Sequence, residues 1–106
     1  MASGRLGTAD LAATTNTTLY TVPANTFSVI TVAFCNRGTT SATVRLAVAL
    51  TTTPGNDEWY EYDTVIPAKG VVERTGLVVD ATKKVIVYSS AASVTAIAHG
   101  IETSTV

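Results

Sequence analysis

The sequence has few charged residues, one cysteine and one histidine. Of its 106 residues only 14% are Asp, Glu, Lys or Arg, and the formal net charge is -1, whereas a typical soluble domain carries roughly 25% charged residues. One cysteine excludes an internal disulfide and a cysteine-based zinc site, and one histidine excludes a multi-histidine metal site. The near balance of charges argues against nucleic acid, whose binding depends on Lys and Arg neutralising phosphates. We therefore expect no metal, no cofactor and no nucleic-acid partner.

Long apolar runs are also missing. No stretch approaches the roughly 20 apolar residues that a membrane helix needs. Residues 1–18 hold one arginine and no continuous apolar segment, so we expect neither a signal peptide nor a membrane partner. The mean hydropathy is nevertheless positive, at +0.31. An apolar chain that does not enter a membrane is expected to cover part of its surface with other protein chains.

The residues that are abundant favour β-structure. Thr, Val and Ile together account for 39 residues, and their branched side chains suit a pleated strand better than a helix. Short segments of this kind alternate with turn residues, as expected of an antiparallel β-sandwich with about seven or eight strands. Jelly-roll and immunoglobulin-like strand orders both fit. The expected strands span residues 17–22, 26–35, 41–50, 58–65, 71–79, 85–89 and 94–101.

Two segments carry further information on the domain. Residues 1–16 are small and polar, which predicts a flexible N-terminal arm before a β-sandwich domain of residues 17–106. Residues 41–50 alternate cleanly, which predicts that Val44, Leu46, Val48 and Leu50 face inward. Residues 26–35 are apolar on both faces, as in a strand that is central or covered by a partner.

Catalytic chemistry is sparse, and we expect the protein not to be an enzyme. His99 lies among apolar residues of the last expected strand, where a packed or interface role is favoured over a general base. Cys35 ends an apolar strand, and free cysteine is among the residue types most often buried. Asp57, Glu58, Glu61 and Asp63 form one acidic cluster. Alternation places Trp59 with Glu61 and Asp63 on one strand face and Tyr60 with Tyr62 on the other.

Several stretches resemble a known group of proteins. They are LYTVPANTFSVITVAFCNRGTTSATVRLAVAL, EYDTVIPAKGVVERTGLVV and KKVIVYSSAASVTAIAHGIE, and with their flanks they cover roughly residues 3–102. This text resembles small structural proteins encoded in tailed-phage genomes. The resemblance implies a β-sandwich virion component that assembles with copies of itself or with capsid or tail proteins. It supplies no catalytic residues to compare.

These observations predict a phage virion structural protein. The first hypothesis is a capsid decoration protein that stabilises the head through protein–protein contacts, with the major capsid protein and further copies of itself, as a trimer, for partners. A tail, baseplate or fibre component is the second hypothesis. A glycan- or receptor-binding module is the hypothesis from a different class. The residues expected at an interface are Leu6, Leu11, Phe27, Ile30, Trp59, Tyr60 and Tyr62.

Overall fold

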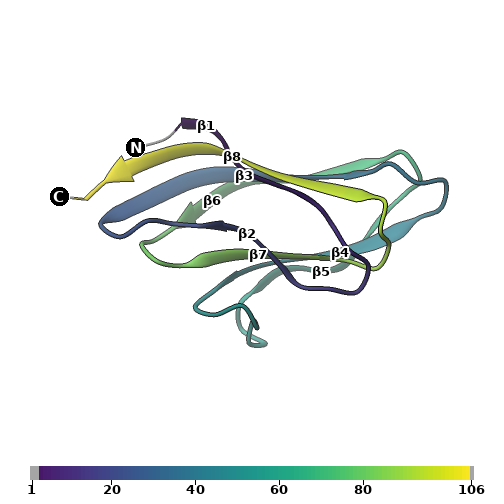
Figure 1. Ribbon diagram of the computed structural model, residues 1–106, viewed down its shortest axis with the longest axis horizontal. Helices are drawn as coiled ribbons and strands as arrows, with labels where there is room; N and C mark the ends of the chain where they lie inside the picture. The colour runs from purple at the N-terminus through teal and green to yellow at the C-terminus, as the bar shows by residue number, and fades with distance from the viewer. Residues whose placement is uncertain (1–2, 106) are drawn as a thin grey trace.

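The computed structural model of the chain describes residues 3–105, which form eight β-strands and no helix (Figure 1). Accordingly, this part of the chain holds no helix long and apolar enough to cross a membrane. The all-β fold class is confirmed. The strands are β1 (Ser3–Asp10), β2 (Thr17–Thr21), β3 (Thr26–Asn36), β4 (Ala42–Ala49), β5 (Trp59–Ile66), β6 (Val71–Val79), β7 (Lys84–Ser89) and β8 (Val94–Ser104).

The strands form two four-stranded antiparallel sheets, with orders β1-β8-β3-β6 and β2-β7-β4-β5. Figure 1 shows them as two layers. The pairing is nested along the chain: the first strand pairs with the eighth, the second with the seventh, the third with the sixth and the fourth with the fifth. The first and last strands therefore lie side by side, with Ser3 opposite Ile101.

The main hydrophobic core lies between the two sheets, as in a sandwich. Phe34 and Val32 of β3 enter it from one sheet, and Val44 and Leu46 of β4 from the other, all fully buried. Burying each such side chain contributes roughly 1.5–3 kcal/mol. The inward orientation predicted for Val44 and Leu46 is confirmed, and Val48 packs against the same core from its margin. Leu50 was wrongly expected inside: β4 ends at Ala49, and Leu50 is 64% exposed.

The expected N-terminal arm is largely part of the sandwich. Residues 3–10 form β1 on the edge of β8, and Leu11 is buried in the core. This corrects the prediction for most of residues 1–16; residues 1 and 2, like residue 106, lie outside the described part. Strand β1 has few apolar residues, and its backbone pairing with β8 holds it at the sheet edge. Gly7 permits this packing, since a Cβ there would lie 2.1 Å from the carbonyl oxygen of Leu19.

A buried tyrosine links the two sheets. Tyr20 of β2 shares a hydrogen bond of 2.7 Å with the Ser28 hydroxyl of β3 and donates another to the Glu102 carboxylate of β8. Burial, reinforced by the bond to Glu102, raises the pKa of Tyr20 to about 12. The tyrosine therefore stays neutral and keeps its donor far above neutral pH.

Candidate binding surfaces

The outer side of sheet β1-β8-β3-β6 carries exposed aliphatic side chains; we call it the open face. Val29 of β3 lies directly opposite Val78 of β6 on one side and Ile101 of β8 on the other. These side chains are 37%, 63% and 52% exposed, respectively. Val71 is also exposed, opposite Cys35 at the far end of β3. Aliphatic surface therefore continues across three neighbouring strands.

The open face also carries His99 and Cys35. His99 is exposed and lies between Arg5 of β1 and Thr31 of β3 in the strand register. Cys35 was expected in the core, but it is exposed. The reason is the alternation of β3, in which Phe34 takes the inward position and turns its neighbour outward. Residues 26–35, which are apolar on both faces, thus direct one set of side chains into the core and the other set onto the open face.

The outer side of sheet β2-β7-β4-β5 is built differently; we call it the covered face. Ala47 and Ala49 of β4 and Ile86 of β7 form a second buried cluster there. The indole of Trp59, from β5, packs against this cluster. One large aromatic ring thus removes the apolar centre of this face from solvent.

An arginine is stacked beside that cluster. The guanidinium of Arg45 lies 4.1 Å from the ring centroid of Tyr62 and 4.4 Å from that of Tyr88. Its Nε donates to the Asp63 carboxylate over 2.7 Å. The hydrogen bond to Asp63 raises the pKa of Arg45 above its ordinary value. Trp59 extends the group, since its ring meets that of Tyr62 edge to face at 5.3 Å.

Two irregularities in β5 determine this arrangement. The register with β4 shifts on both sides of Leu46, and each shift inserts an extra residue into β5. Asp63 has a positive φ of 55° within this stretch. Strict alternation predicted Tyr62 on the face opposite Trp59, which is wrong, because bulges re-aim the side chains of a strand. Trp59, Tyr60 and Tyr62 therefore do not form one aromatic platform: Trp59 meets Tyr62 on the covered face, and Trp59 also lines a pocket together with Tyr60.

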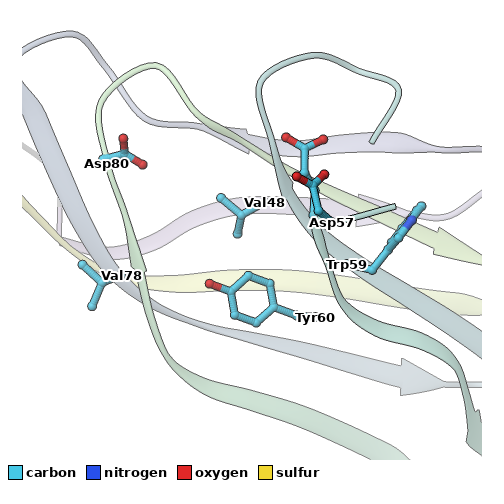
Figure 2. Close-up of a pocket in the computed structure, with 7 residues that line it drawn as sticks. Val48, Asp57, Trp59, Tyr60, Val78 and Asp80 are labelled. Atoms are coloured by element: carbon cyan, nitrogen blue, oxygen red, sulfur yellow. The ribbon is translucent and has the colours of Figure 1, made fainter. Parts of the chain in front are cut away.

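This pocket, which we call the edge pocket, has a volume of about 320 Å³ and is open to solvent. It lies where β5 and β6 form the free edges of the two sheets. Figure 2 shows the Tyr60 ring between Val78 and Trp59, with Val48 and Asp57 above it. The lining residues are Val48, Asp57, Glu58, Trp59, Tyr60, Val78 and Asp80.

The three carboxylates of the edge pocket are held differently. Both Glu58 oxygens accept backbone N–H groups, from Gly55 at 2.7 Å and Leu50 at 3.2 Å. Asp80 accepts a hydrogen bond from Lys83 at 3.0 Å, which lowers the pKa of Asp80. Asp57 forms no ion pair with any residue of 3–105. Within that range, no group of three or more His, Cys, Asp or Glu residues could hold a metal ion.

The residues expected at an interface occupy different environments. Leu11 and Ile30 are buried within the sandwich, so in this fold they are core residues and their expected role as contacts is corrected. Leu11 directly follows β1 and Ile30 lies within β3, and the branched aliphatic side chain of each is part of the core. Leu6 and Phe27 are partly exposed, and Tyr60 and Tyr62 are exposed. No local pattern predicts the edge pocket, because the pocket depends on the approach of β5 to β6.

Comparison with known proteins identifies no relatives. No protein-family model matches the chain, and neither curated proteins nor solved structures give a match.

Proposed function

We propose that the protein is a structural component of a tailed-phage particle, a decoration protein that stabilises the head by binding other virion proteins and copies of itself. The sequence resemblance supports the class of protein. The nested strand order supports a jelly roll, an eight-stranded, two-sheet architecture found in viral capsid proteins and in lectins. The proposed location is therefore the virion. A tail or fibre component would use the same fold.

The observation that carries the assembly role is the open face. Val29, Val78 and Ile101 form an aliphatic row across three strands. An apolar patch of this kind marks an interaction surface when it extends over a few hundred Å². This proposal accounts for the low charge content of the chain, because the core of a protein interface is depleted in charged residues.

The mechanism is association by mass action. Apolar area on the open face leaves water only when a neighbour covers it, so the contact favours the assembled particle over free subunits. A specific contact of this type buries upwards of about 1,000 Å² in total. We propose a trimer as the associating unit.

The test compares two matched surface substitutions. Ile101→Lys places a charge on the open face, and Val65→Lys places one at a similarly exposed strand position on the other sheet. Wild-type protein and each variant are examined by light scattering after size exclusion, and by co-sedimentation with shells of the major capsid protein from the same genome.

Wild-type protein and V65K are expected to associate with themselves or with shells, and I101K to lose at least about ten-fold in affinity, because a charge would be buried in an apolar contact. Thiol labelling of Cys35 gives a second readout, since assembly should protect it. A wild-type protein that neither self-associates nor binds shells would refute the proposal, as would equal behaviour of I101K and V65K.

A further inference from the structure

We propose that the edge pocket binds the guanidinium group of an arginine presented by a partner protein. This site adjoins the assembly contact, with which it shares Val78, but it is centred on the free edges of β5 and β6 rather than on the middle of the open face. The inference rests on the shape of the hollow, on its balance of hydrogen-bond donors and acceptors, and on two arginine sites that the chain builds for itself.

The hollow fits one long side chain. Its volume of about 320 Å³ is at the small end of the ligand-pocket range of roughly 300–1,000 Å³. Tyr60 is 45% exposed and offers its ring as one wall. Val48 and Val78 line the same pocket as that ring (Figure 2). An aliphatic stem can pack on the two valines while a flat cation stacks on the ring.

The polar atoms of the lining are mostly acceptors. Asp57 has no cation partner within residues 3–105, and Asp80 has one, the half-buried Lys83. The side-chain donors of the lining are the Trp59 indole N–H and the Tyr60 hydroxyl. A guanidinium carries five N–H donors and no acceptor, so it complements this lining. A sugar brings acceptors together with its donors, and many of its oxygens would find no donor here.

The chain uses the same chemistry for two of its own arginines. Arg45 stacks between tyrosine rings and pairs with Asp63, as described above. Arg74 pairs with Glu61 at 2.9 Å and lies 5.6 Å from the ring centroid of Tyr60. Each site combines a tyrosine, a carboxylate and a guanidinium. The edge pocket offers the same two groups, the Tyr60 ring and the Asp57 carboxylate. Arg74 already lies 5.6 Å from the Tyr60 ring centroid, whereas Asp57 pairs with no cation of residues 3–105, so the cation is missing only at Asp57.

Arginine is favoured over lysine because of its shape. Its planar, weakly hydrated guanidinium stacks on an aromatic ring and can pair with both oxygens of one carboxylate. An ammonium group is more strongly hydrated and has no flat face. The open side of the pocket also lets a side chain enter from a neighbouring surface.

The probe is the peptide acetyl-Gly-Arg-Gly-amide, titrated into ¹⁵N-labelled full-length protein. Its control contains citrulline, which has nearly the same shape without the charge. We expect shifts confined to the Trp59 indole N–H and to the amides near Gly55 and Tyr60. The arginine peptide should bind at least about five-fold more tightly than the citrulline peptide, the factor given by about 1 kcal/mol of cation–π and ionic attraction.

Two substitutions locate the site. Asp57→Asn should weaken arginine binding about five-fold, and Glu73→Gln, at an exposed carboxylate outside the pocket, should leave it unchanged. Ile101→Lys should also bind the arginine peptide normally, which separates this test from that of the assembly contact. Amide spectra of each variant verify the fold.

The proposal is overturned if the peptide causes no pocket shifts at 50 mM or if the citrulline peptide binds equally well. It is overturned in favour of a glycan site if galactose or N-acetylglucosamine shifts the same resonances at lower concentration. Unchanged binding by D57N would also refute it.

Discussion

The covered face and the open face treat apolar side chains in opposite ways. On the covered face, Ala47, Ala49 and Ile86 are buried beneath Trp59. On the open face, Val29 lies between two more exposed aliphatic residues, Val78 and Ile101, which are 63% and 52% exposed. Both faces belong to four-stranded antiparallel sheets of one small domain.

The two faces differ because Trp59 and Tyr62 lie in β5, whose register with β4 shifts twice. The extra residues in β5 bring Trp59 and Tyr62 to one side, where they shield the sheet and stack with Arg45. The sheet of the open face has no aromatic residue in either of its edge strands, β1 and β6. Trp59 shields the centre of the covered face, although Val65 and Tyr62 remain exposed there, whereas the aliphatic row of the open face lies in solvent.

The largest loss of stability is expected when the Trp59 ring is removed from the covered face. Trp59→Ala should lower the free energy of unfolding by about 2–3 kcal/mol, because it exposes the alanine–isoleucine cluster and loses the ring contact with Tyr62. Trp59→Phe should recover more than half of this loss. Urea melts at neutral pH measure both. A cost of W59A below about 0.5 kcal/mol would show that the ring does not shield the cluster.

The next test asks how strongly the two sheets are joined. Tyr20→Phe removes the hydroxyl that links β2 to β3 and β8, and should cost about 1–2 kcal/mol at pH 7. It also predicts a pH dependence. Because the pKa is about 12 in the folded protein and about 10 when unfolded, the stability from this group is complete below pH 10.

That stability is lost as the pH rises through 12, since the unfolded chain ionises first. Between pH 10 and 12 the wild type should lose on the order of 2 kcal/mol more than Y20F does. If the free energies of unfolding of wild type and Y20F change equally between pH 10 and 12, burial and the bond to Glu102 do not raise the pKa of Tyr20.

A smaller effect is expected at the stacked arginine. Arg45→Met keeps the apolar stem and removes the charge, and should cost about 1 kcal/mol, the sum of two partly exposed cation–π contacts and one ion pair. Arg45→Lys should recover less than half, because an ammonium does not stack as a plane. If R45K is as stable as wild type in thermal melts, the stacking contributes little and charge alone accounts for the site.

The smallest effect on the isolated chain should come from the open face. Ile101→Thr should change the stability of the monomer by less than about 0.5 kcal/mol, since the side chain is 52% exposed and threonine suits a strand equally well. Dilute urea melts measure this. A loss above about 1 kcal/mol would mean that Ile101 already packs within the monomer, and the contrast between the two faces would fail.

Much of the fold followed from local patterns. Alternation and β-branched residues predicted β3, β4 and β6 almost to the residue, and the inward side chains Val44 and Leu46. Strand β1 was missed because its sequence, SGRLGTAD, carries no apolar alternation. Its pairing depends on the exposed backbone of β8, which lies more than 80 residues away and which no local pattern reports.

Less of the site could be predicted. The acidic and aromatic residues of 57–63 were identified, but their faces depend on bulges that have no clear residue signature. Alternation failed at Tyr62 for this reason, and it gave Cys35 no preference between core and surface. The edge pocket joins β5 to residues of β4 and β6, so its existence is a property of the tertiary structure.

The nested pairing of the strands has a consequence for how the chain folds. The β4–β5 pair is closed by a short connection, whereas the β1–β8 pair must close a loop of almost the entire chain. Loop-closure entropy rises with the length to be closed, and domains dominated by such distant pairings fold in milliseconds to seconds. We expect the central hairpin to form early and the two ends of the chain to meet last. Strands β1 and β8 of the open-face sheet then pair in the final step, so the aliphatic row, to which β8 contributes Ile101, is complete only when the whole chain has folded.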